Sequence, residues 1–145
     1  RTPLHAFPLM RVAPLADGEA PPSRPGGRVS WSALKEVPLI GLPPDNPIQR
    51  LVERELDRLG RSGESRPTVN HFDTLIAMVE AGLGTAVMPS LARVACRRHR
   101  VRTDLLTRPV VSPGFHMIAR RGRRLPEQAD AFVRTLVDML PAMTG

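Results

Sequence analysis

Two short stretches of the sequence carry side chains that could hold a small molecule. The first runs from Leu42 to Asn46 and the second from Asn70 to Thr74. Each follows a short apolar segment and precedes a helical pattern, so each would offer the backbone N–H groups of a helix start, which favour carboxylates. Amide, imidazole and hydroxyl groups would add hydrogen bonds, and prolines would add apolar walls. The predicted ligand-binding residues are Leu42, Pro43, Pro44, Asp45, Asn46, Asn70, His71, Phe72 and Thr74.

Some of these residues have a simpler interpretation as helix caps. Asn46, Asp73 and Thr74 are residue types that favour the start of a helix whatever the protein does. Residue type alone favours capping over binding, so both interpretations stay open at this point.

Cys96 and His99 stand three residues apart, which suits a nucleophilic pair or a metal site that also takes His71 and His116. A structural zinc site needs four closely spaced ligands, usually in two pairs, and only one pair exists here. A Cys–His dyad needs an orienting partner and an oxyanion glycine, and neither is near. We therefore predict no metal, no cofactor and no catalytic residue, and we expect Cys96 to be a small, mostly buried side chain.

The elements that must position these residues alternate between short apolar strands and amphipathic helices, which predicts an α/β fold with a mostly parallel, Rossmann-like sheet. Ligands of such sheets bind at the carboxyl ends of the strands, where both stretches would lie. Helices are predicted over 47–59, from about Asp73 to Gly82, and over 125–140. Strands are predicted over 7–15, 37–42, 67–70, 84–88, 101–106 and 115–119, with a loop over 16–28.

Residues at the element ends support these boundaries. Asp45 or Asn46 can cap the helix over 47–59, Pro47 suits its first turn, and Gly60 can end it.

Two serines and two glycines mark further ends. Ser30 is expected to cap a short helical turn over 29–34, and Ser90 another short helix. Gly82 and Gly84 follow a helix and lack a Lys-Ser/Thr pair, so they do not form a phosphate loop. We expect a left-handed helix end at Gly82 and a tight strand entry at Gly84.

Composition limits the class of protein. The 145 residues are 41% hydrophobic, which is enough for a real core, and no apolar run approaches the roughly 20 residues that span a bilayer. A single cysteine excludes a disulfide framework, and the N-terminus has no apolar signal region, so a cytoplasmic protein is expected. The first residue is Arg rather than Met, which suggests a fragment or a processed product.

The positive charge is concentrated in one part of the sequence. The net charge is +7, and 20 of the 21 basic residues are arginine. Ten arginines and a single acidic residue lie in the arginine segment, residues 93–124. Because the segment has no interleaved aromatic residues and no recognisable reading helix, we interpret it as a solvated surface rather than a DNA-binding one.

The order of these motifs resembles the effector-binding domain of LysR-type transcriptional regulators. The helix that ends in Val79-Glu-Ala-Gly-Leu-Gly84 and the strand that ends at Pro89 carry most of the resemblance. Segments 29–34 and 37–40, the helix with Val52, Leu56 and Gly60, and the stretch 119–136 follow in the family's order.

The resemblance implies a periplasmic-binding-protein-like (type 2) lobe. Residues 1–110 would form the second lobe of the domain, and residues 111–145 the closing strand and helix that return to a first lobe, which is largely missing. A small, anionic effector would bind between the lobes of a cytoplasmic homodimer or tetramer. The helix over 47–59 would carry part of the subunit interface, and DNA would be bound only through an N-terminal helix-turn-helix outside this chain.

Two other classes remain open at this stage. A periplasmic-type solute-binding protein would share the lobe fold, and only a secretion signal or a helix-turn-helix upstream would separate the two classes. A small hydrolase is the third alternative, and it would need turnover that depends on His71 or Cys96. The resemblance favours a regulator that is not an enzyme, has no cofactor and does not bind a membrane.

Overall fold

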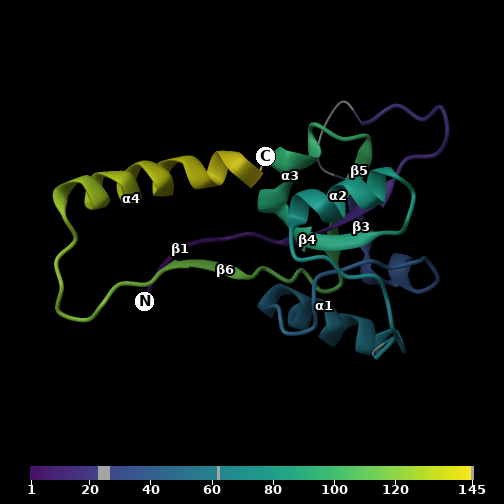
Figure 1. The fold of residues 1–145 in the computed structure, drawn as a ribbon, viewed down its shortest axis with the longest axis horizontal. Coiled ribbons are helices and arrows are strands. Elements are labelled where there is room, and N and C mark those ends of the chain that lie inside the picture. The colour runs from purple at the N-terminus through teal and green to yellow at the C-terminus, as the bar shows by residue number, and fades with distance from the viewer. Residues whose placement is uncertain (23–26, 62, 145) are drawn as a thin grey trace.

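The computed structural model of the chain describes residues 1–22, 27–61 and 63–144, and its centre is a four-stranded sheet (Figure 1). The strand order is β3 (Gly27–Ser30), β5 (Val101–Thr107), β2 (Leu9–Pro14) and β4 (Ala86–Pro89). β3 runs parallel to β5, whereas β2 is antiparallel to both β5 and β4. Beyond β4, two isolated parallel bridges add short extended segments to the sheet. One bridge pairs Leu39 with Thr85, and the other pairs Gly41 with Thr68.

Helices cover both faces of this sheet because alternate strand residues point to opposite sides. Met10 and Val12 of β2 pack beneath α2 (Phe72–Glu80) and α3 (Arg93–Cys96), in one buried cluster. Leu9 joins a second buried cluster beneath α1 (Pro47–Arg58) and the 3-10 helix η1 (Trp31–Leu34). The core of the lobe therefore has two layers, one on each side of the sheet.

Local signals at the helix ends are largely confirmed. The Asn46 side chain accepts a hydrogen bond from the Ile48 N–H at 2.8 Å, and Pro47 opens α1. Gly60 has a φ of +74°, the left-handed conformation that glycine tolerates best. Ser30 caps η1 by accepting from the Ser32 N–H.

Two further glycines behave as expected and one serine does not. Gly82 has a φ of +82°, and a Cβ on Gly84 would lie 3.1 Å from the Pro38 carbonyl oxygen. The expectation that Ser90 caps a helix is wrong. Pro89 occupies the cap position of the 3-10 helix η2 (Ser90–Ala92), and the fully buried Ser90 hydroxyl makes no hydrogen bond to the described residues.

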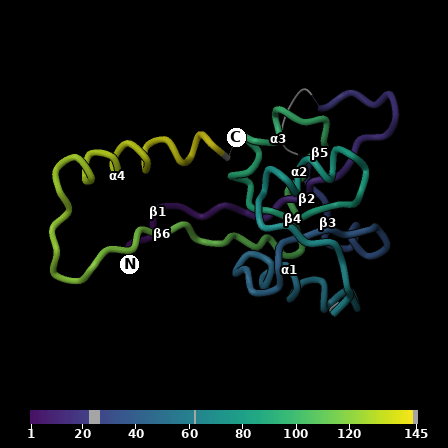
Figure 2. The backbone as a smooth tube through the Cα atoms, viewed as in Figure 1, coloured from purple at the N-terminus to yellow at the C-terminus, as the bar shows by residue number. Residues whose placement is uncertain are grey.

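A second, smaller unit extends away from the lobe (Figures 1 and 2). β1 (Thr2–Ala6) pairs antiparallel with β6 (Gly114–Met117), and we call this pair the ladder. At its far end the chain turns into α4 (Glu127–Met139), which runs back toward the lobe as the yellow helix of Figure 1. The 3-10 helix η3 (Leu140–Thr144) then reaches η2 and α3, with Leu140 buried.

The structure confirms the α/β class and corrects parts of the sequence-based topology. The sheet is mixed rather than mostly parallel. β2 begins beside the last residue of β4, so it runs antiparallel to both of its neighbours, β4 and β5. The single strand predicted over 7–15 is β2 alone, and the pairing of β1 was missed. The loop predicted over 16–28 ends earlier, since β3 begins at Gly27, and its positions 23–26 lie outside the described residues.

The division at residue 110 stays a prediction, although the ladder joins residues from both sides of it. Among the described residues, no helix is long and apolar enough to cross a membrane.

Candidate functional site

The two predicted stretches lie at the same edge of the sheet. We call residues 42–46 the first site loop and residues 70–74 the second site loop. The extended segments that precede the two loops run parallel to each other and are bridged between Gly41 and Thr68. The first of these segments is also bridged in parallel, through Leu39, to Thr85, just before β4. The carboxyl ends of all three segments therefore open at one edge, as the sequence predicts for a ligand site.

The first site loop is only partly available to a ligand. The Leu42 side chain is buried in the core, and its backbone N–H donates to Gln49 Oε1 at 3.1 Å. Pro43 is half-buried, and Pro44 and Asp45 are exposed. Asn46 is half-buried and engaged as the cap of α1, so the capping interpretation holds for this residue.

The second site loop is more open. Asn70, His71 and Thr74 are exposed, and Phe72 is partly buried against the core. His71 occupies the cap position of α2, but its side chain makes no capping hydrogen bond. The amide, the ring and the hydroxyl of this loop therefore remain accessible at the surface.

A pocket of about 300 Å³ joins the second site loop to the chain after β4. His71, Phe72 and Asp73 line it from the second site loop, and the other lining residues are all apolar: Pro89, Leu91, Ala92 and Ala95. The first site loop does not line this pocket, so the structure does not bring all nine predicted residues into one cavity.

The residues after β4 were missed by sequence reasoning, as was a lining role for Asp73. One signal could have found them, because Pro89 marks the carboxyl end of a third strand of the same kind. Asp73 also places a carboxylate in the first turn of α2, where it partly offsets the positive end of the helix.

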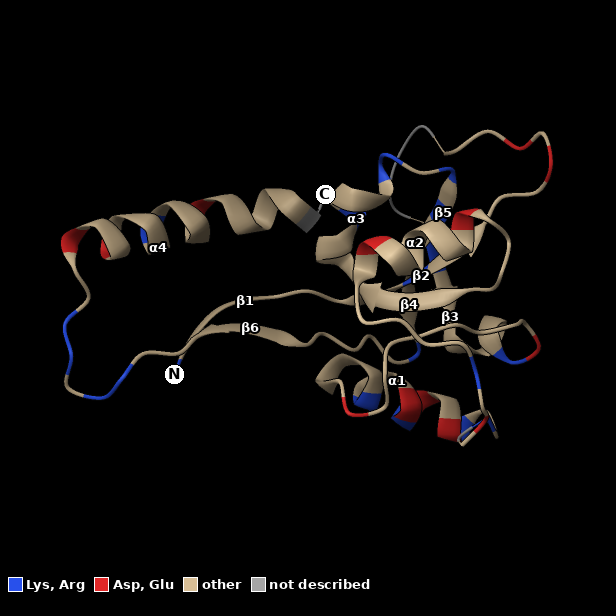
Figure 3. Ribbon diagram, in the orientation of Figure 1, with Lys and Arg blue, Asp and Glu red and all other residues tan. Residues whose placement is uncertain are grey.

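The arginine segment does not form one continuous basic face. Part of it lies along α3 and β5, where Arg102 pairs with Glu19 at 2.6 Å and Arg11 pairs with Asp104 across the sheet. The other part, residues 120–124, lies in the exposed loop between β6 and α4, at the far end of the ladder (Figure 3). The segment is thus divided between two places in the fold.

Cys96 and His99 are not arranged as a nucleophilic pair. The His99 ring nitrogen Nδ1 contacts the Glu80 carboxylate, and its backbone N–H donates to the Cys96 carbonyl oxygen. Cys96 is buried, and this desolvation raises the pKa of its thiol to about 11, although the charge of Arg93 opposes the shift. Within the described ranges, no three His, Cys, Asp or Glu side chains gather in a way that could hold a metal ion.

Comparison with known proteins places this architecture in a family. The model of the LysR substrate binding domain matches residues 2–141. The HTH-type transcriptional regulator YbhD of Escherichia coli K12 is 26% identical over 111 residues, which are 77% of this chain and 35% of YbhD. The family match favours a regulator over the periplasmic-type solute-binding alternative.

Two solved structures share the fold. A Corynebacterium glutamicum OxyR C206 mutant superposes with a TM-score of 0.71 at 19% identity, covering 99% of this chain and 44% of OxyR. The Synechocystis PCC6803 CcmR regulatory domain, in complex with 2-PG, superposes with a TM-score of 0.68 at 13% identity. The match covers 95% of this chain and 65% of the CcmR chain. The chain spans about a third of YbhD and less than half of OxyR. It belongs to the LysR substrate-binding domain family, a family of transcriptional regulators rather than of enzymes.

Proposed function

We propose that this chain is the ligand-sensing part of a LysR-type transcriptional regulator, and that a small, anionic effector binds at the edge formed by the two site loops. The observation that supports this most directly is where the ladder leaves the lobe. Leu9 pairs with Pro89, the Leu9 N–H donates to the Val111 carbonyl at 2.7 Å, and the Phe7 N–H donates to the Pro113 carbonyl at 3.1 Å. Both connections therefore emerge at the edge where the site opens.

A first lobe attached through the ladder would face this site and close it. Residues 1–110 would then be the second lobe and 111–145 the return, with β1 joining β6 as the connection between lobes. Exposed apolar side chains on the ladder, on α4 and on the connection between them indicate a surface that the rest of the protein would cover: Phe115, Ile118, Leu125, Phe132, Val137 and Met139.

The chemistry of the edge favours a small acid with an apolar part. The pocket offers an apolar wall for the body of the ligand, and His71, Asn70 and Thr74 offer hydrogen bonds for its polar end. The related CcmR regulatory domain binds 2-PG, which supports a small-molecule ligand for this chain as well. All nine predicted residues remain in the proposed site, the first site loop mainly through Pro43, Pro44 and its backbone.

The remaining properties follow from this assignment. The chain would act by binding rather than catalysis and would need no cofactor. It would work in the cytoplasm as part of a homodimer or tetramer with α1 at the interface. DNA would be contacted through an N-terminal helix-turn-helix, and ligand binding would shift the arrangement of lobes and subunits.

A thermal-shift screen of small carboxylates, with 2-PG included, tests the ligand class. A ligand of the folded state raises the melting temperature, and at a hundred times its Kd it adds about 2.7 kcal/mol of stability. We expect at least one carboxylate to raise the melting temperature of the intact protein by several degrees. A shift produced by neutral sugars and by no carboxylate would contradict the proposed chemistry.

The location of the site is tested with a matched pair of threonines. Thr74→Ala removes an exposed hydroxyl from the second site loop, and Thr135→Ala removes one from α4. We expect Thr74→Ala to weaken the carboxylate that the screen identifies by about fivefold to tenfold, since a hydrogen bond contributes about 1 kcal/mol. Equal affinities for the two variants, measured by titration calorimetry, would place the ligand elsewhere.

A further inference from the structure

Gln49, in the first turn of α1, connects the first site loop to a partly buried polar network. Its side chain is 4% exposed, and both ends of its amide are hydrogen-bonded. Oε1 accepts from the Leu42 N–H at 3.1 Å, and Nε2 donates to Glu53 Oε1 at 3.0 Å. The loop that begins at Leu42 is therefore attached to α1 by a side chain, not only by the chain itself.

This arrangement differs from ordinary helix capping. Asn46 and Gln49 have the spacing of a capping box, in which the later side chain bonds the backbone N–H of the cap residue. Here the Asn46 N–H donates to the Pro43 carbonyl at 3.0 Å instead. Gln49 is therefore not needed at the cap and is directed to Leu42.

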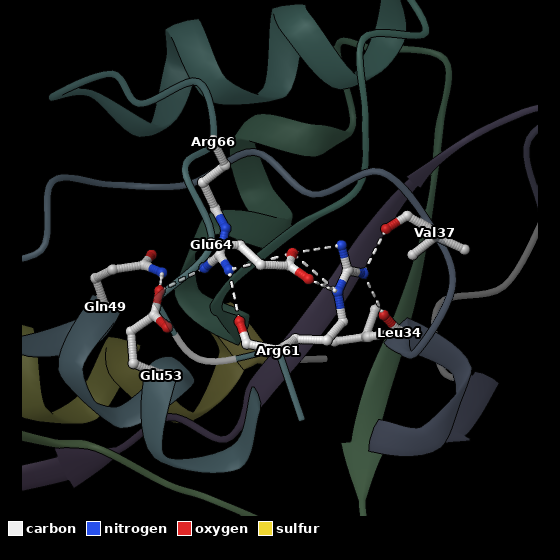
Figure 4. A network of polar contacts seen from close by, with 7 residues as sticks. All are labelled: Leu34, Val37, Gln49, Glu53, Arg61, Glu64 and Arg66. Atoms are coloured by element: carbon white, nitrogen blue, oxygen red, sulfur yellow. Dashed lines mark hydrogen bonds and ion pairs between the residues drawn. The ribbon is translucent and has the colours of Figure 1, made fainter. Parts of the chain in front are cut away.

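The surrounding charges determine which way the Gln49 amide faces. The Arg66 side chain is 7% exposed, and its guanidinium donates to Glu53 Oε1 and, at 3.1 Å, to the Arg61 carbonyl (Figure 4). A carboxylate only accepts hydrogen bonds, so the Gln49 NH₂ must face Glu53. Its oxygen then faces the other way and accepts from the Leu42 N–H.

The network also holds the segments that carry both site loops. Arg61 donates to the Leu34 and Val37 carbonyls at 2.8 and 2.6 Å, just before the segment that leads into the first site loop (Figure 4). Arg66 directly precedes Pro67, whose carbonyl accepts from the Gly41 N–H. Gly41 itself leaves room for Gln49, since a Cβ there would lie 2.8 Å from Oε1.

We propose that Gln49 is a positioning residue of the ligand site. Its amide, oriented by Glu53 and Arg66, fixes the Leu42 N–H and with it the start of the first site loop. The two prolines that follow have restricted backbones, so the position of Leu42 sets the path of the surface that faces the ligand. The effect on ligand binding rests on the function proposed above, whereas the positioning of Leu42 does not.

Hydrogen–deuterium exchange in the intact protein tests the positioning, with no ligand present. Pro43 and Pro44 carry no amide hydrogen, so a peptide that ends at Asn46 reports few amides besides Leu42. Gln49→Met removes both hydrogen bonds and keeps the volume, and we expect the Leu42 amide to exchange about tenfold faster. Gln128→Met, at an exposed position in the first turn of α4, is the matched control and should leave this peptide unchanged.

A charge exchange separates positioning from simple loss of packing. In Gln49→Glu two carboxylates face each other and neither can donate a hydrogen bond, so we expect the Leu42 amide to exchange faster than in the wild type at the same pH. Adding Glu53→Gln restores one donor and one acceptor between the two positions, and the double variant should recover wild-type protection. Unchanged exchange in Gln49→Met, or no recovery in the double variant, would overturn the proposal.

The effect of Gln49 on ligand binding is measured with 2-PG, or with the carboxylate that gives the largest thermal shift in the wild type. We expect Gln49→Met to weaken its binding about tenfold and the double variant to restore it. If exchange responds and binding does not, Gln49 positions Leu42 but the ligand lies elsewhere, and the proposed role in the site is wrong. If no carboxylate shifts the wild type, the proposed function fails while the exchange result still decides the positioning.

Discussion

At the scale of single residues, neighbouring groups engage several of the side chains that the sequence suggests for chemistry or binding. His99 is engaged by Glu80, and Asn46 is engaged by the start of α1. Cys96 lies in the core with Met10 and Val79 around the same buried cluster. The residues left open to a ligand are those of the second site loop, which offer an amide, an imidazole, a carboxylate and a hydroxyl for reversible hydrogen bonding.

Cys96 gives a direct test of this packing. Its pKa of about 11 lies two units above the ordinary 9.0, so the folded protein has about a hundredfold less thiolate near pH 8. We expect 5,5′-dithiobis-(2-nitrobenzoate) to react with the folded chain about a hundredfold more slowly than with the same chain in urea. Fast labelling without unfolding would contradict the buried position.

The sign of the pH effect follows from the same thiol. Between pH 9 and 11 the unfolded chain has lost the thiol proton and the folded chain has not, so stability falls as the pH rises through this range. Cys96→Ala should lack this part of the pH dependence. Urea midpoints of the two proteins at pH 8 and pH 10 measure the difference.

At the scale of elements, the turn after α1 is held by charge rather than by apolar packing. Arg61 bonds Glu64 through both Nε and Nη2 while it also bonds two backbone carbonyls. The hydrogen bond from Arg61 is the main reason that the pKa of Glu64 lies below its ordinary 4.5; burial opposes the shift, and the charges of Arg61 and Arg66 add to it.

Acid should therefore weaken this turn in a defined direction. The unfolded chain protonates Glu64 near its ordinary pKa and the folded chain only at lower pH, so the contribution to stability is present above about pH 4.5 and is lost as the pH falls below it. We expect Glu64→Gln to lower the urea midpoint at pH 6 and to approach the wild type at pH 3.5. Glu36→Gln, at an exposed position, controls for the loss of one negative charge, and parallel behaviour of the two variants would disprove the role of the turn.

Much of the element order could be predicted from the sequence because its signals are local. The caps of α1 and the glycine that ends it lie within a few residues of the helix, and the apolar spacing of Leu56 and its neighbours gives the buried face. β1 could not be predicted in the same way, because its partner Met117 is 115 positions away from Thr2. An edge strand of this kind is recognised only when its partner is known.

The site shows the same division between local and distant information. Residue types indicated His71 and Asn70 as candidates, but the pocket lining at Leu91 and Ala95 depends on how the chain returns after β4. Gln49 was not predicted, because its contact with the Leu42 N–H depends on the path of the loop before α1.

At the scale of the whole molecule, α4 has one apolar face that the described residues leave largely uncovered, since none of its residues is buried. Phe132 is 66% exposed and Met139 is 52% exposed, although their spacing is that of a buried helix face. The chain after α4 returns to the lobe, where η3 contacts η2 and α3 and Leu140 is buried. Such a face is expected to be covered by the rest of the protein.

Phe132→Ser tests that cover in two forms of the protein. In the 145-residue chain we expect less self-association and an unchanged melting temperature, because the side chain is already exposed. In the intact protein the same change should cost about 3 kcal/mol, the usual loss when a large buried apolar side chain is removed. Sedimentation and thermal unfolding measure the two effects, with Asp138→Ser as the control, and an unchanged intact protein would show that this face is not covered.

The paired backbone at Phe7 and Pro113 has one more consequence. The lobe between these residues begins and ends at neighbouring points, so it is an insertion in the topological sense, joined to the rest by a double strand. A segment with adjacent ends can be transplanted into a surface loop of another protein without stretching either junction. Residues 7–113 could therefore be inserted as one segment into a surface loop of a fluorescent protein, whose fluorescence would then report conformational changes of the lobe.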